Sequence, residues 1–152
     1  MEFKRITGDR RLYWQLLLLG DEQPELVSRY LSKGELYALY DPGLVAVAVV
    51  CDQGSGICEL KNLAVDPAFQ KQGYGHRFLE FLTDLYAASF HTMLVGTGGT
   101  PRILRFYERC GFSYSHKIPH FFFDNYDHPI VEDGILLEDM FYLKKDLTQK
   151  SS

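Results

Sequence analysis

The pattern of hydrophobic and polar positions predicts a chain in which strands and helices are interspersed. Runs rich in β-branched and aromatic residues, bounded by glycine and proline turns, predict about seven strands. These lie at 2–6, 35–40, 44–51, 57–65, 92–97, 112–118 and within 135–147. Apolar residues at helical spacing predict about four helices, at 10–19, at 24–31, from the glycine-rich segment to about 88, and from 101 to 110.

Turn and capping residues fix where several of these elements end. Asp41-Pro42-Gly43 is a strong hairpin signal between two strands. Thr100 with Pro101 is typical of a helix start, with the threonine hydroxyl as the cap, and Gly111 ends that helix. The order of elements indicates an α/β (α+β mixed) fold, a mostly antiparallel mixed sheet covered by helices, in a single domain over 1–152.

One helix and one strand have apolar patterns that predict more than their bounds. In the helix that follows the glycine-rich segment, one apolar face is expected from Phe78, Leu79, Leu82, Leu85 and Tyr86. In the strand at 57–65, the apolar phase slips by one residue at Lys61–Asn62. Such a slip indicates a β-bulge, which leaves backbone groups unpaired and separates a strand from its neighbour. A strand buried on both faces explains the same pattern, and both interpretations stay open.

Composition narrows the class of protein. The chain has 152 residues, 46% hydrophobic and 24% charged, with a net charge of −4, which are ordinary values for a globular protein. No basic stripe indicates a nucleic-acid partner, and no apolar run is long enough for a membrane span. The apolar run 16–19 is too short for a signal peptide. We expect a cytoplasmic protein that binds neither nucleic acid nor membrane.

Three cysteines make no disulfide framework. Cys51 and Cys58 flank the turn at 53–56 and are expected to face each other across a hairpin as reduced thiols. None of the cysteines has a C-x-x-C partner. His116, His120 and His128 lie near Asp124 and Asp127 in sequence, but their spacing matches no zinc pattern, so we expect no metal.

The segment Gln70-Lys71-Gln72-Gly73-Tyr74-Gly75 carries the clearest chemical signal. A glycine-rich turn that opens a helix presents unpaired backbone N–H groups at the positive end of the helix dipole, where phosphate oxygens bind. The segment is not a Walker loop, because it lacks G-x-x-x-x-G-K-[ST], and it is not a dinucleotide fingerprint, because Phe78 stands where a third glycine is needed. The remaining question is which phosphate-bearing cofactor it holds.

A second motif narrows the choice of cofactor. The strand ending in Leu63-Ala64-Val65 and the pattern Gln70-x-x-Gly73-x-Gly75 are followed by a helix that ends in Phe106-Tyr107-x-x-x-Gly111-Phe112. This order closely resembles the GCN5-related N-acetyltransferase (GNAT) family, with its acetyl-CoA motif [QR]-x-x-G-x-[GA] and its Φ-Y-x-x-x-G-F helix. The resemblance covers 44–112 well and the whole chain loosely. The tail resembles a subset of small bacterial GNAT proteins.

The resemblance implies a set of acetyl-CoA contacts. The backbone of Leu63, Ala64 and Val65 would pair with the pantetheine arm like an added strand. Backbone N–H groups of the loop would hold the pyrophosphate, with Gln70 at its entrance and Lys71 as an auxiliary charge. Many family members have an asparagine seven residues before the tyrosine, where this chain has Thr100, which puts that contact in doubt. The full set comprises Leu63, Ala64, Val65, Gln70, Lys71, Gln72, Gly73, Tyr74, Gly75, His76 and Thr100.

The resemblance also implies two catalytic roles. Tyr107 matches the tyrosine that gives a proton to the departing CoA thiolate, although a core tyrosine would show the same helical spacing. Glu59, just before the slipped strand position, would take the amine proton directly or through water; a solvated edge carboxylate is the alternative. A backbone N–H, at Leu63, would stabilise the oxyanion.

The expected function is therefore an N-acetyltransferase that moves the acetyl group of acetyl-CoA directly to a primary amine through a ternary complex. Cys110 lies beside the helix stop, but no motif places a His or Asp to activate it, so a ping-pong route is not expected. Two alternatives are a CoA- or acyl-CoA-binding module without turnover, and a protein-interaction module on the same scaffold.

The segment 119–134 bears on the acceptor. Its aromatic residues could line a substrate cleft, and its acids, Asp124, Asp127, Glu132 and Asp133, could attract an ammonium group. A packed edge or a homodimer contact is the alternative. The acceptor is expected to be a small-molecule or peptide amine whose identity the sequence does not specify.

Overall fold

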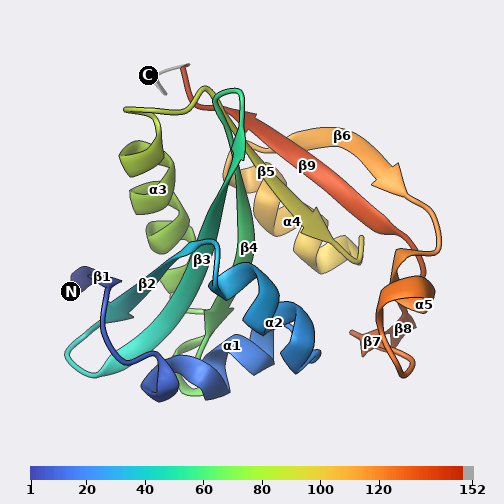
Figure 1. Cartoon of the computed structure of the whole chain (residues 1–152), viewed down its shortest axis with the longest axis horizontal. Helices are drawn as coiled ribbons and strands as arrows, with labels where there is room; N and C mark the ends of the chain where they lie inside the picture. Colours follow the sequence, from blue (N-terminus) through green and yellow to red (C-terminus); the bar gives the residue numbers. More distant parts are fainter. Residues whose placement is uncertain (149–152) are drawn as a thin grey trace.

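The computed structural model of the protein describes residues 1–148. Its centre is a seven-stranded sheet in the order β1-β2-β3-β4-β5-β9-β6, antiparallel throughout except for the parallel pair β4–β5 (Figure 1). The strands are β1 Glu2–Ile6, β2 Glu35–Tyr40, β3 Leu44–Gly54, β4 Ile57–Val65, β5 Thr92–Thr97, β6 Ser113–Ile118 and β9 Met140–Asp146. This confirms the predicted mostly antiparallel mixed sheet.

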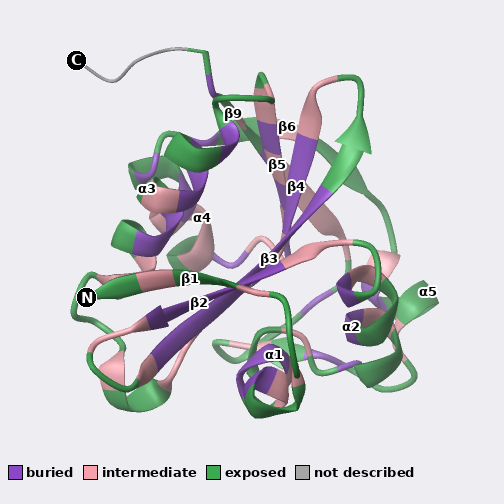
Figure 2. Ribbon diagram, turned by 60° about the vertical axis from the view of Figure 1, so that its left-hand side comes forward, coloured by how far each residue is buried: buried purple, intermediate pink, exposed green. Residues whose placement is uncertain are grey.

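Helices cover both faces of this sheet. The α-helices are α1 Trp14–Gly20, α2 Pro24–Leu31, α3 Tyr74–Tyr86, α4 Pro101–Arg109 and the short α5 Phe121–Asn125, with 3-10 turns at Arg11–Tyr13 and Pro67–Phe69. One buried cluster joins α3 and α4 to the sheet through residues such as Phe78, Leu82 and Tyr107. A second joins α1 and α2 to the opposite face through Leu17, Val27 and Val49 (Figure 2). No helix within 1–148 is long and apolar enough to cross a membrane.

The centre of the sheet contains the irregularity that the sequence indicated. On β3, Val49 pairs with Asn62 while the next residue, Val50, pairs with Leu60, so Lys61 is the extra residue of a β-bulge. The parallel pairing of β4 with β5 stops at Leu60–Val95, although β4 continues for five more residues. The two strands therefore separate at the bulge, and the last residues of β4 have a free edge on the β5 side.

Several expectations about local structure are wrong. Cys51 pairs with Glu59 rather than with Cys58, and the two thiols belong to clusters on opposite faces of the sheet. Leu85 is 45% exposed and lies outside the apolar face of α3. Thr100 is the N-terminal cap residue of α4, but its side chain makes no capping hydrogen bond. Its buried hydroxyl has no partner within 1–148.

The segment 119–134 is more structured than the sequence indicated. It contains α5 and the strand β7 (Val131–Glu132), which pairs with β8 (Ile135–Leu136) in a two-stranded sheet. Phe122 and Ile130 from this segment and Leu137 form a small third cluster. This part of the chain forms a separate arm beside the main sheet (Figure 1).

Candidate active site

The glycine-rich loop lies where β4 ends. Lys71 and Gly73 have left-handed backbone conformations with φ values of 64° and 86°, which turn the chain into α3 at Tyr74, within the glycine-rich segment. The first intrahelical bond of α3 runs from Arg77 N to Gly73 O, at 3.1 Å. The N–H groups of the preceding residues therefore have no acceptor inside the helix and are directed outward from its positive end.

Side-chain contacts hold this loop in place. Gln70 Nε2 donates to the carbonyl of Val65 at 3.0 Å, which ties the loop to the end of β4. The Tyr74 hydroxyl donates to Asp41 Oδ2 at 2.6 Å. A Cβ on Gly75 would lie 3.3 Å from the Phe106 ring, so the glycine lets α3 and α4 approach closely. Lys71, Gln72 and His76 are exposed at the surface of the loop.

Tyr107 lies on α4, on the same face of the sheet as α3. Its ring packs edge-on against Phe106 and Phe112, with centroids 5.0 and 5.6 Å apart. Burial raises the pKa of the Tyr107 hydroxyl well above its usual range, and the nearby Cys110 and Glu132 act in the same direction. The phenol is therefore a proton donor rather than a phenolate at neutral pH.

Glu59 lies on the other face. It stands opposite Cys51 on β3, and directly paired residues share a face, so its side chain points to the side that α1 and α2 cover. It is 7% exposed, so the alternative of a solvated edge carboxylate is wrong. Gln53 Nε2 donates to Oε1 at 3.1 Å, Lys61 Nζ lies 3.1 Å from Oε2, and the Tyr142 hydroxyl donates to Oε2 at 3.4 Å.

A chain of hydrogen bonds on this second face was not visible in the sequence. Asn62, beside the bulge, donates through Nδ2 to the Leu17 carbonyl and to the Tyr30 hydroxyl, both at 2.9 Å. Tyr30 donates to Asp21 at 3.4 Å, and Tyr126 donates to Asp21 at 2.9 Å. Because these residues are up to 105 positions apart, no local pattern could have joined them.

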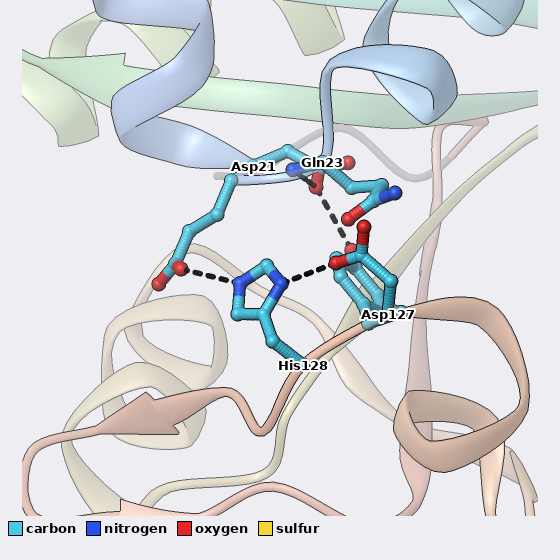
Figure 3. A network of polar contacts seen from close by, with 6 residues as sticks. Asp21, Gln23, Asp127 and His128 are labelled. Atoms are coloured by element: carbon cyan, nitrogen blue, oxygen red, sulfur yellow. Dashed lines mark hydrogen bonds and ion pairs between the residues drawn. The ribbon is translucent and has the colours of Figure 1, made fainter.

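The three histidines near the arm lie in different surroundings. His116 stacks on Tyr142 with centroids 4.8 Å apart, and His120 has a left-handed backbone at the start of α5. His128 contacts Asp127 and lies 3.2 Å from Glu22, in the network of Figure 3. Residues 1–148 contain no group of three or more His, Cys, Asp or Glu side chains that could hold a metal ion.

Cys110 has a neighbour that no motif indicated. Its Sγ lies 3.3 Å from Nδ1 of His76, which α3 brings against the end of α4. The two residues are 34 positions apart, and the contact follows from the packing of the helices. The sequence has no motif that places a histidine at Cys110, and tertiary packing brings His76 to it.

Comparison with known proteins agrees with this geometry. A family model of the acetyltransferase (GNAT) domain matches residues 32–114. An uncharacterized N-acetyltransferase, YvbK of Bacillus subtilis, is 33% identical over 137 residues, which cover 88% of each chain. A GNAT acetyltransferase of Elizabethkingia anophelis with bound acetyl-CoA superimposes with a TM-score of 0.89 at 33% identity, covering 95% of this chain and 97% of that one.

A second solved structure gives the same result. An acetyltransferase of Bacillus subtilis in complex with CoA has a TM-score of 0.86 at 30% identity, over 95% of this chain and 97% of that one. The matched region of the family model contains the bulge, the glycine-rich loop and the helix of Tyr107. The chain belongs to the GNAT family of acetyltransferases.

Proposed function

We propose that the protein transfers the acetyl group of acetyl-CoA directly to a primary amine within a ternary complex. The observation that carries this proposal is that Tyr107 packs on one face of the sheet while the side chain of Glu59, one residue before the opening at which β4 and β5 separate, points to the other face. A thioester held in that opening has a proton donor on one side and a carboxylate on the other.

The separated edge of β4 suits the pantetheine arm. Pairing between β4 and β5 ends at Leu60, so the backbone from Leu63 to Val65 is available to an added strand-like partner. The outward N–H groups from Lys71 to His76 lie where the same ligand would place its pyrophosphate. Thr100 stands where many family members have an asparagine, and its buried hydroxyl, which has no partner within 1–148, would contact the arm only after a local rearrangement.

The chemical step then uses this chain's own groups. Glu59, directly or through a water molecule, takes a proton from the ammonium form of the acceptor. The amine nitrogen attacks the thioester carbon, and the backbone N–H of Leu63 stabilises the resulting oxyanion. The C–S bond breaks, and the Tyr107 hydroxyl gives its proton to the thiolate. The amide nitrogen loses its second proton, which passes through water to the Tyr107 oxygen and restores the phenol as the neutral amide is released.

Direct transfer also agrees with the position of Cys110. Its thiol opens into a groove that reaches Thr92 and Asp146, at the start of β5 and the end of β9. The opening between β4 and β5 begins beyond Val95, at the other end of β5. Cys110 thus faces away from the opening in which the acetyl group is proposed to lie.

Calorimetric titration with acetyl-CoA, followed by thiol release against a panel of amines, tests the proposal. We expect binding in the micromolar range and amine-dependent release of CoA. Gly73→Glu should abolish binding because a carboxylate and a side chain would occupy the phosphate site, while circular dichroism shows an unchanged fold. Absence of binding would contradict the proposal, and binding without turnover by any amine would indicate a non-catalytic module.

A further inference from the structure

A groove lies between α3 and the turn that joins α4 to β6, on the face that carries Tyr107. Its volume is about 720 Å³. Leu79 and Thr83 of α3 line one side, and the ends of β5, β6 and β9 form the rest of the wall. The charged groups that face it are His76, Glu80, Asp84, Arg109, Lys144, Lys145 and Asp146. The proposed acetyl transfer assigns no role to this space.

A thiol, an imidazole and a carboxylate meet at one end of the groove. Cys110 Sγ lies 3.3 Å from His76 Nδ1, and His76 Nε2 lies 3.8 Å from Glu80 Oε2. His76 and Glu80 are four residues apart on α3, so they share one helix face. Lys145 Nζ donates to the Cys110 carbonyl at 2.8 Å and fixes the turn that carries the thiol. This order of nucleophile, base and orienting acid is the arrangement that activates thiols in enzymes.

The other two thiols provide an internal comparison. Cys51 Sγ faces the Tyr30 carbonyl at 3.4 Å, and Cys58 Sγ faces the Thr92 carbonyl at 3.6 Å. A carbonyl can accept the S–H hydrogen bond but cannot remove the proton. Burial raises the pKa of all three thiols, to about 12 for Cys58. At Cys110 the ammonium of Lys145 opposes the effect of burial on the thiol pKa, while the carboxylate of Glu80 adds to it. Cys110 alone of the three lies against an imidazole and lines the groove.

We propose that Cys110 is a modification site that forms a mixed disulfide with a low-molecular-weight disulfide admitted through this groove. His76 Nδ1 takes the thiol proton, and the Cys110 thiolate attacks one sulfur of the incoming disulfide. A new S–S bond forms, the old one breaks, and the departing thiolate takes the proton from the imidazolium of His76. Glu80, whose carboxylate lies 3.8 Å from Nε2, orients the ring.

The test measures adduct formation in the folded protein with oxidised glutathione, by intact mass and peptide mapping over time. We expect Cys110 to form the mixed disulfide at least about tenfold faster than Cys51 or Cys58. In denaturant the three cysteines should react at similar rates, which shows that the difference comes from the fold. No acetyl-CoA is present, so a failure here is separate from a failure of the proposed acetyl transfer.

Two variants test whether the rate of mixed-disulfide formation at Cys110 depends on His76 and Glu80. His76→Gln should lower the Cys110 rate towards that of the other two cysteines, and Glu80→Gln should lower it about two- to threefold, because Glu80 is largely exposed. Circular dichroism and the melting temperature verify that each variant is folded. Labelling of Cys110 no faster than of Cys51 and Cys58, or an unchanged rate in both variants, would overturn the proposal.

Discussion

At the scale of single residues, the proposed chemistry depends on burial. Tyr107 is 8% exposed and Glu59 is 7% exposed, and Glu59 lies one residue before the stretch of β4 that does not pair with β5. Charges and hydrogen bonds act more strongly in such surroundings than in water. In the proposed reaction, these two side chains would exchange protons with the bound ligand rather than with bulk solvent.

Tyr107→Phe tests the role of the phenol directly. The ring and its contacts with Phe106 and Phe112 stay, so the fold and the affinity for acetyl-CoA should change little. Turnover should fall by about 10² or more, the usual contribution of a positioned proton donor. Steady-state kinetics and calorimetry measure the two quantities. Equal losses in turnover and in affinity would show that Tyr107 has a structural role only.

The sequence predicts those site features that depend on neighbouring residues, and it does not predict those that depend on tertiary packing. The backbone groups of the loop depend on local features, such as Gly73 at a helix start, and the sequence indicated them. The contact of Cys110 with His76 depends on how α3 packs against α4, which local sequence does not encode. Thr100 has the residue type of a helix cap, but its burial leaves the hydroxyl without the predicted bond.

At the scale of elements, α1 packs closely against β4 beside its bulge. Gly20 ends α1, and a Cβ there would lie 2.2 Å from Asn62 Oδ1. Asn62 is 4% exposed and bonds both Leu17 and Tyr30, so it has little room to move. The glycine therefore lets the helix end rest on the strand at the residue next to the bulge.

Gly20→Ala should destabilise the protein by about 1–2 kcal/mol, because the overpacking outweighs the better helix propensity of alanine. Urea denaturation measures the change. Gly8→Ala is the matched control, since a Cβ at Gly8 meets nothing within 4 Å, and its effect should stay within about 0.5 kcal/mol. Similar denaturation midpoints for the two variants would show that Asn62 moves aside without loss of stability.

The helices and strands, too, are predictable from sequence where local periodicity determines them, and not where tertiary contacts do. Strands and helices with clear periodicity lie close to their predicted positions, and the phase slip at Lys61–Asn62 is the observed bulge. The pattern did not indicate α5, β7 or β8. Their apolar residues, such as Phe122 and Ile130, bury against each other in a small local cluster rather than along one long face. Short elements of this kind are stabilised by tertiary contacts, not by periodicity.

At the scale of the whole molecule, polar contacts connect the arm 119–134 to the helices α1 and α2. Tyr126 bonds Asp21 in the loop between these helices, and His128 contacts Glu22 in the same loop (Figure 3). Asp21 is also bonded by Tyr30, which reaches Asn62 at the bulge. The arm, the helices and the site strand are therefore joined through one continuous set of hydrogen bonds.

The pH dependence of this junction is set by His128. Its hydrogen bond with Asp127, and then that with Glu22, raise the pKa of its imidazole above the ordinary value. A histidine with a raised folded-state pKa adds stability below its unfolded value, near 6.5, and that contribution is lost as the pH rises through the folded value. The contribution is small because the side chain is 44% exposed.

His128→Gln should consequently lower the melting temperature at about pH 5.5 and have progressively less effect towards pH 9, since only the charged imidazole gains from its carboxylate partners. Taking the difference between wild type and variant removes the contribution of Asp21, whose pKa burial raises in both proteins. Glu22→Gln supplies the control: in its presence the pH-dependent difference should shrink, because one of the two carboxylates is gone. A difference that grows with rising pH would contradict the assignment, because it would require an imidazole that is stabilised in its neutral form.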